Sequence, residues 1–469
     1  MTDPTPERIA ELEAELGRER RRSRSVQRRL AAKEQELLEI YRSRAWGFIG
    51  TLRSLKYRLL DPLLGMVGVS WPRRRPTAPA PASGAQPLCP RSNPGRYDIL
   101  CFSTSDWDGR FQRPQQLLSL FADAGHRVFY VSQRFRSDGP AWAAAEKRRN
   151  VWEVTLRGEG LNVYTEALGE RARALLFEGV DALQRDVSLG ADTAMFVHLP
   201  FWGPLARQAR ERFGWPVLYD CMDLLAGFST VRRAMVAQEE ELLAQADVVV
   251  TCSSILEQHA LRRRKDVLVI RNGCDYEHFA NASAPPAHVR PVVGYYGAIA
   301  DWFDSALVAG LAIRRPDWDF VLVGSTYNAD IAQLVRLPNV SLPGEEAYEA
   351  LPDWLAGFDV TIIPFKRTRL TDASNPVKMY EILAGGKPIV SVPLPEVAAL
   401  VPLVRIAATV DEFEREIAAA LAEDAGAAGP RRAFARENTW EHRFALLAAA
   451  TAGALARAVP AAAGTSVLS

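Results

Sequence analysis

The sequence predicts an α/β protein built from two doubly wound, Rossmann-like domains that follow an N-terminal helical arm. Short apolar runs alternate with helical stretches over most of the 469 residues. Continuous apolar runs, each followed by a polar turn and a helix, are typical of buried parallel strands. The runs form two series, at 97–102, 127–132, 194–200, 217–222 and 247–252, and at 292–298, 320–325, 359–365 and 388–393. Each series predicts one domain, whose ligands should bind beyond the carboxyl ends of its strands.

Periodicity and composition set the expected boundaries. Apolar residues at spacings of three, four and seven predict a short coiled coil within 7–41, although a lone solvated helix fits the same pattern. The basic amphipathic segment that follows suits either an anionic membrane surface or packing on the main body. The expected division is a coiled-coil and amphipathic arm at 1–70, a Pro/Ala-rich linker at 71–95, Rossmann-like domains at 96–285 and 286–435, a crossover helix at 436–455 and a disordered tail at 456–469.

Composition argues against several classes of protein. The net charge is only +1, which disfavours a chain built mainly to bind nucleic acid, although residues 1–95 hold 18 Lys/Arg and 10 Asp/Glu. The five cysteines form no CxxC pair and are expected to be small core residues in a reducing cytosol. No run of 18 apolar residues and no signal peptide is apparent, so a protein without a membrane span is expected.

The stretch SNPVKMYEILAGGKPIVSVP, residues 374–393, has the strongest functional pattern. Asn375-Pro376 should open a helix whose free N–H groups favour an anion, with Lys378 in its first turn. Lys366, Arg367 and Arg369 precede it in a basic loop, so together these cations would hold a diphosphate. Glu381, one turn after Lys378, is suited to accept hydrogen bonds from ribose hydroxyls. An ordinary strand-loop-helix unit with a surface Lys–Glu pair is the alternative.

This stretch resembles the nucleotide-sugar site of retaining GT-B glycosyltransferases of family 4, in the branch of bacterial cell-surface and teichuronic-acid-type polysaccharide transferases. The resemblance covers about 97–455 and includes NGxD at 272–275 and the strand end of GYYGAIADWFD at 294–304. Glu381 matches the second of the family's two site glutamates, but Ala373 occupies the position of the first. Asp372 or Asn375 is a hypothetical substitute. The Arg and Lys that often follow the glycine at 297 are also missing, which moves phosphate neutralisation to the 366–378 loop.

The resemblance implies three sets of site residues. The catalytic set is His198, Lys378 and Glu381. The nucleotide-sugar set is Gly297, Lys366, Arg367, Arg369, Asp372, Ser374, Asn375, Pro376, Val377, Lys378 and Glu381. The acceptor-side set in the first domain is Asp106, Arg110, Arg113, Gln116, Asp220 and Asp223. Asp106 and Asp108 form a DxD, but GT-B transferases generally need no fixed metal, so neither a metal nor a cofactor is expected.

The resemblance implies a retaining glycosyltransferase that moves a sugar from a UDP- or GDP-linked donor to a saccharide or lipid-linked acceptor in cell-surface polysaccharide synthesis. The first domain would take the acceptor and the second the nucleotide sugar. A cytoplasmic protein is expected, with the arm as a contact to the inner membrane face and a route to self-association. A catalytically degenerate GT-B scaffold of a polysaccharide assembly complex is the alternative. The base, sugar, acceptor, linkage and oligomeric state stay open.

Overall fold

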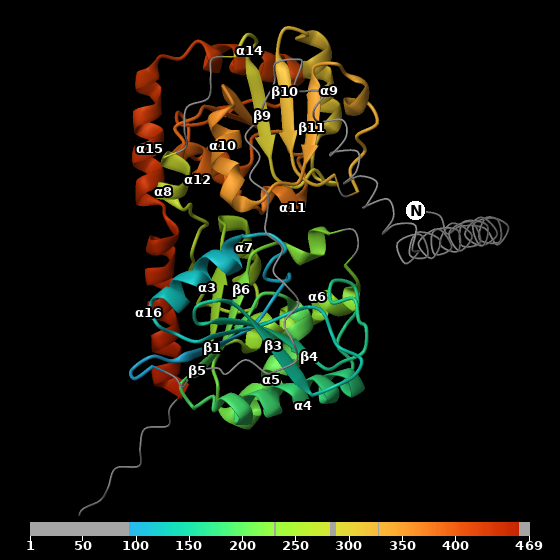
Figure 1. The fold of residues 1–469 in the computed structure, drawn as a ribbon, viewed down its shortest axis with the longest axis vertical. Helices are drawn as coiled ribbons and strands as arrows, with labels where there is room; N and C mark the ends of the chain where they lie inside the picture. Colours follow the sequence, from blue (N-terminus) through green and yellow to red (C-terminus); the bar gives the residue numbers. More distant parts are fainter. Residues whose placement is uncertain (1–92, 229–230, 282–287, 327, 459–469) are drawn as a thin grey trace, which may run out of the picture. The chain divides into compact units, whose positions relative to one another are not determined.

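The computed structural model describes residues 93–228, 231–281, 288–326 and 328–458, which contain two α/β domains with mainly parallel sheets. The predicted fold class is therefore confirmed for this part of the chain (Figure 1). The arm at 1–70, nearly all of the linker and most of the tail lie outside the described residues.

The first domain is built on an eight-stranded sheet in the order β3-β4-β2-β1-β5-β6-β7-β8. Only β3 runs antiparallel to its neighbour, β4. Its strands are β1 (Asp98–Phe102), β2 (Val128–Val131), β3 (Trp142–Arg148), β4 (Val151–Leu156), β5 (Thr193–Val197), β6 (Val217–Cys221), β7 (Val248–Thr251) and β8 (Leu268–Val269). Its helices include α3 (Arg113–Asp123), α4 (Glu170–Val187), α5 (Gly203–Phe213), α6 (Arg233–Gln245) and α7 (Ser254–Ala260), with the short η2 (Pro200–Trp202) and η3 (Leu225–Gly227).

The second domain is built on a six-stranded parallel sheet in the order β11-β10-β9-β12-β13-β14. Its strands are β9 (Val292–Tyr296), β10 (Asp319–Val323), β11 (Val340–Gly344), β12 (Val360–Ile363), β13 (Ile389–Ser391) and β14 (Arg405–Ile406). Its helices include α8 (Tyr276–Ala280), α9 (Ser305–Arg314), α10 (Leu351–Ala356), α11 (Arg369–Asp372), α12 (Val377–Ala384), α13 (Pro395–Ala398), α14 (Val410–Leu421) and α15 (Ala428–Glu437).

The last helix, α16 (Trp440–Ala458), packs against the first domain although it follows the second in sequence. Figure 1 shows it, in red, beside α3. The ring centroids of Phe444 and Phe121 lie 4.8 Å apart, and Trp440 and Leu447 are buried in the same apolar cluster as α3. The chain thus crosses between the domains twice.

The first crossing, after β8, is fastened by a network centred on Glu396 of α13. This carboxylate is 8% exposed and accepts hydrogen bonds from the N–H and hydroxyl of Ser254, both at 2.9 Å, and from Nε of Arg271 at 2.8 Å. Nδ2 of Asn375 donates to it at 3.0 Å. Ser254 belongs to the first domain and Asn375 to the second, so one buried acceptor joins three segments.

Within the described residues, no helix has both the length and the apolarity that a membrane span requires. The four cysteines in this part of the chain, Cys101, Cys221, Cys252 and Cys274, are buried and unpaired. No cluster of His, Cys, Asp and Glu there has the geometry of a metal site.

Candidate functional site

At the carboxyl edge of the second sheet, three glycine turns contact one another through their main-chain atoms. Gly297 follows β9 with φ +126°, and Gly324 follows β10 with φ +154°, a backbone conformation that only glycine adopts without strain. A Cβ on Gly324 would lie 1.8 Å from the carbonyl oxygen of Gly297, so the two turns touch directly. The Gly324 N–H donates to the carbonyl of Gly344, at the end of β11, at 2.7 Å. The ends of three neighbouring strands therefore form a continuous glycine floor, Gly297–Gly324–Gly344.

Lys378, in the first turn of α12, lies over one end of the glycine floor. A Cβ on Gly297 would lie 2.9 Å from its Cε and 3.1 Å from its Nζ. The ammonium group stands 5.4 Å from the ring centre of Tyr295 and 5.0 Å from that of Phe365, within cation–π range. Burial lowers the pKa of Lys378 to about 8, with Glu381 opposing this shift and the charge of Arg110 adding to it. A cation held against rings and a main-chain floor is well placed to receive an anion.

Glu381 lies one turn further along α12 and is 5% exposed. The hydroxyl of Tyr296 donates a hydrogen bond to its Oε2 at 3.0 Å. Burial raises the pKa of Glu381 to about 7, although the Tyr296 hydrogen bond and the charge of Lys378 both act to lower it. The carboxylate is thus oriented by a tyrosine and costly to keep charged, so a donor such as a ribose hydroxyl would stabilise it.

The residues that open α12 hold the domains together. Asn375 accepts the Asn272 N–H at its Oδ1, at 3.0 Å, and the Asn272 side-chain amide at its carbonyl, at 2.5 Å. Pro376 is the N-cap of α12, Val377 packs against the apolar cluster around α3, and the Ser374 hydroxyl donates to the carbonyl of Thr371 at 2.7 Å. The side chain of Asn375 is therefore committed to contacts within the protein.

The basic loop before α12 also uses most of its groups internally. Lys366 donates from Nζ to the carbonyl of Asp301 at 3.0 Å, and Arg367 pairs with Asp372 at 2.5 Å. Arg369 is exposed at the start of α11. Ala373 is fully buried, and its carbonyl accepts the Ser253 hydroxyl of the first domain at 2.6 Å. At the position of the family's first glutamate, this chain therefore has a buried alanine whose carbonyl joins the two domains.

Two consecutive residues of the first domain reach the carboxyl edge of the second sheet. Nε of Arg110 donates to Oε1 of Glu345, directly after β11, at 2.7 Å. The rings of Phe111 and Tyr348 lie 5.2 Å apart, and the imidazole of His278 stacks on Tyr348 at 4.7 Å. Arg110, predicted to be on the acceptor side, is therefore placed beside the glycine floor.

Another group of charged residues lies inside the first domain. Arg113 forms a two-point ion pair with Asp220 of β6, at 2.8 and 3.0 Å, and both side chains are less than a tenth exposed. The same guanidinium donates to the carbonyl of Ile270 at 2.9 Å and to Oδ1 of Asn272 at 3.1 Å. His198, at the end of β5, has its Nε2 3.9 Å from Asp220 and its Nδ1 3.4 Å from the Cys101 sulfur.

The environment of His198 fixes its charge state. Burial lowers its pKa to about 4, even though Asp220 acts to raise it, while Arg113 lowers it further. The imidazole is therefore neutral at physiological pH, and its side chain is 3% exposed.

The remaining residues predicted to be on the acceptor side have different surroundings. Asp106 accepts the Ser132 hydroxyl at 2.6 Å and pairs with Arg134. Gln116 is buried on α3, and Asp223 is exposed after β6.

Sequence reasoning missed three polar residues around the floor. Tyr296 orients Glu381, Glu345 holds Arg110, and Tyr348 stacks between Phe111 and His278. The pair Tyr295-Tyr296 closing an otherwise apolar strand was an available signal, because a strand hidden on both faces seldom needs hydroxyls.

Comparison with known proteins assigns both domains to glycosyltransferase families. Residues 109–273 match the glycosyl transferase 4-like domain, and residues 290–423 match the glycosyl transferases group 1. The chain belongs to the GT-B glycosyltransferases of the family 4 type. The second match contains the glycine floor, Lys378 and Glu381, and the first contains Arg110, Arg113 and His198.

A relative identified by sequence agrees with this assignment. The chain is 31% identical over 211 residues to TuaH of Bacillus subtilis (strain 168), a protein assigned as a glycosyltransferase of teichuronic acid biosynthesis. The match covers 40% of this chain and 53% of TuaH, about half of that relative's length.

Among solved structures, sucrose-phosphate synthase of Thermosynechococcus elongatus superposes with a TM-score of 0.62 at 16% identity, covering 77% of this chain and 100% of that one. Anabaena HepE in complex with UDP and glucose gives a TM-score of 0.57 at 16% identity, covering 76% and 99%. These likenesses show the fold.

Proposed function

We propose that this GT-B protein is a retaining glycosyltransferase that moves a sugar from a nucleoside-diphosphate sugar to a saccharide or lipid-linked saccharide. The observation that carries the proposal is the pairing of Lys378 and Glu381 on successive turns of α12, beside a glycine floor at the carboxyl ends of parallel strands. Such an edge is where ligands of these sheets bind. Lys378 takes a phosphate and Glu381 accepts from the ribose.

The proposed chemistry needs no protein nucleophile. The bond between the sugar C1 and the diphosphate oxygen breaks, the acceptor oxygen forms a bond to C1 on the same face, and the leaving diphosphate takes the acceptor's proton. The protein positions the reactants and stabilises charge on the leaving group. Lys378 supplies the positive charge that stabilises the leaving diphosphate. His198 is neutral and buried at a strand end, and its part is to shape the sugar side of the site rather than to carry a proton.

The relatives guide the choice of substrates. The HepE structure contains UDP and glucose, which makes UDP-sugars the first donors to test, ahead of GDP-sugars. TuaH is assigned to teichuronic acid synthesis, which supports a cell-surface polysaccharide as the acceptor. A contact with the inner membrane face and self-association would both depend on residues 1–70. Deleting that segment tests them through membrane co-sedimentation and the oligomeric state.

Donor binding and transfer give separate tests of the proposal. Purified protein is screened with UDP, GDP, ADP and dTDP and their sugar conjugates by thermal shift; a ligand at about 100 times its Kd should stabilise the protein by about 2.7 kcal/mol. One responding base, and transfer to an acceptor with the anomeric configuration of the donor preserved in the product NMR spectrum, is expected. Binding without transfer would support the scaffold alternative, and an inverted product would refute retention.

A further inference from the structure

We propose that Arg110, supplied by the first domain, binds the diphosphate of the donor together with Lys378 of the second domain. This inference rests on the proposed function and deepens it. Arg110, which was predicted to be on the acceptor side, would instead contact the donor phosphates. It also gives the site a second cation in place of the Arg and Lys that the family often has after the glycine at 297.

Arg110 lies at the carboxyl edge of the second sheet. Arg110 donates to Glu345, one residue after Gly344, and Phe111 packs on Tyr348 at 5.2 Å. These two contacts fix the Arg110–Phe111 segment on the turn after β11. Arg110 therefore stands at one end of the glycine floor, while Lys378 stands at the other end, against Gly297.

The distance between the two ends of the glycine floor suits a diphosphate. In the second sheet β10 lies between β9 and β11, and neighbouring strands are about 4.8 Å apart. The two ends of the floor are thus roughly 10 Å apart, with Gly324 in the middle. Gly297 and Gly344 are both partly exposed, whereas Gly324 between them is buried, so a diphosphate would lie between these two exposed ends of the floor. The guanidinium and the ammonium group would approach it from opposite ends.

Arg110 still has nitrogens that can bind a ligand. The only hydrogen bond found for the Arg110 guanidinium within the described residues uses Nε, which leaves its two terminal nitrogens for a ligand. The other cations predicted to bind phosphate are mostly occupied. Lys366 is bound to the Asp301 carbonyl and Arg367 to Asp372. Arg113, which was predicted to be on the acceptor side, is buried in its pair with Asp220.

The charge of Arg110 acts on Lys378 in the same direction as burial, lowering its pKa, so the two cations lie close enough to repel each other. Like charges brought together repel, and an anion between them relieves that repulsion. Two cations on different domains that share one anion would also favour the association of the domains when the donor is bound.

Nucleotide titration by calorimetry, with UDP, UMP and uridine (or the GDP series if the guanine base responds), tests the inference. Arg110→Ala should weaken UDP binding by about tenfold or more, because it loses a charge-assisted hydrogen bond. Uridine binding should stay the same. The effect on UDP should shrink as salt rises.

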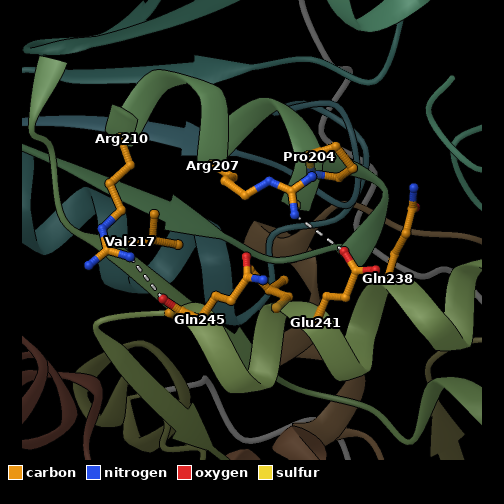
Figure 2. A pocket seen from close by; sticks show the side chains of 10 residues that line it. Pro204, Arg207, Arg210, Val217, Gln238, Glu241 and Gln245 are labelled. Atoms are coloured by element: carbon orange, nitrogen blue, oxygen red, sulfur yellow. Dashed lines mark hydrogen bonds and ion pairs between the residues drawn. The ribbon is translucent and has the colours of Figure 1, made fainter. Parts of the chain in front are cut away.

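Arg207 offers a matched control. Its side chain is 40% exposed and pairs with Glu241, which is 57% exposed; the values for Arg110 and Glu345 are 39% and 50%. Figure 2 shows the Arg207–Glu241 pair between α5 and α6, in a pocket lined by those helices. Arg207→Ala should leave UDP binding unchanged. Glu345→Gln is a second variant; it keeps Arg110 but releases it from its partner, and UDP affinity should be kept or should rise.

Each other result overturns the inference in a recognisable way. An equal loss for uridine and UDP would assign Arg110 to the base. Unchanged UDP affinity with a raised KM for the acceptor would return Arg110 to the acceptor side. A larger effect of Arg369→Ala than of Arg110→Ala would give the phosphate to the loop. Wild-type protein that binds no nucleotide would refute the proposed function itself, and the inference with it.

Discussion

The protein has two clusters of charged residues near the carboxyl ends of strands, one in each domain, and they are built in opposite ways. In the first domain Arg113 and Asp220 neutralise each other through two hydrogen bonds, and the arginine also satisfies carbonyls after β8. In the second domain Lys378 and Glu381 are each shifted toward neutrality by burial.

The contrast between the two clusters gives a criterion that separates structural charges from ligand-binding charges. A buried charge that has all its partners within the protein contributes to the fold and gains little from a ligand. A charge that is desolvated and only partly paired gains from one. By this criterion the Arg113–Asp220 pair holds β6 to the interdomain segment, and Lys378 and Glu381, with Arg110, form the donor site that we propose.

The largest expected effect comes from breaking the first cluster. Arg113→Met leaves Asp220 buried and unpaired, which should destabilise the protein by about 3–5 kcal/mol. The measurement is the urea midpoint at pH 7. The double variant Arg113→Met/Asp220→Leu should recover most of the loss. A single variant as stable as wild type would show that the pair does not support the fold.

The second effect concerns His198 and acid. Its folded-state pKa of about 4 is below the usual 6.5, so the stability it contributes is present above pH 6.5 and is lost as pH falls toward 4. The loss should approach roughly 3 kcal/mol, since each pKa unit corresponds to 1.36 kcal/mol. Urea titrations between pH 7 and 4.5 should show a flatter profile for His198→Gln than for wild type. His442→Gln, at an exposed position, is the control; an equal flattening there would contradict the assignment.

The third effect is on ligand binding in the second cluster. Glu381→Ala should weaken nucleotide binding by about 1.5–3 kcal/mol, the range for hydrogen bonds to a charged group. Because the pKa of Glu381 is raised to about 7, wild-type affinity should also rise with pH through 7 as the carboxylate ionises. Calorimetry from pH 6 to 7.5 should find this rise in wild type and not in Glu381→Gln. Unchanged affinity in the alanine variant would remove Glu381 from the site.

The smallest effects are expected in the basic loop. Lys366 and Arg367 are exposed, and their partners lie within the protein. Alanine at either position should change nucleotide binding by no more than about 0.5 kcal/mol, typical of exposed charges. If either variant weakens UDP as much as Arg110→Ala does, the loop would be part of the binding site and the contrast between the clusters would need revision.

Sequence patterns predicted the central strands well because buried parallel strands need continuous apolar runs. They missed β3, whose residues WAAAEKR are poor strand formers. This strand exists because it pairs with β4 at the edge of the sheet. They also missed β11, VSLPG, an edge strand that contains proline. Both strands are fixed by tertiary pairing, which local propensity does not report.

For the candidate site, too, local sequence patterns predicted some features, whereas contacts between distant residues could not be predicted. The start of α12 after Asn375-Pro376, with Lys378 and Glu381 one turn apart, was readable from local spacing. The contact of Arg110 with Glu345 was not, because it joins residues 235 positions apart. The hypothetical substitutes for the missing glutamate at 373 are Asp372 and Asn375. In the structure Asp372 pairs with Arg367, and Asn375 binds the segment that leaves the first domain.

The glycine floor has an evolutionary consequence. Gly297 and Gly324 touch through their main chains, so a side chain at Gly324 would displace its neighbour, and each turn constrains the other. The peptide groups of the floor are the same whichever residue is present, so substitutions cannot change their chemistry. New donor preferences would therefore arise at the rim, around Arg110 and Tyr348, where single substitutions change shape and charge without disturbing the strand ends. Divergent members of such a lineage should keep the floor and differ around it.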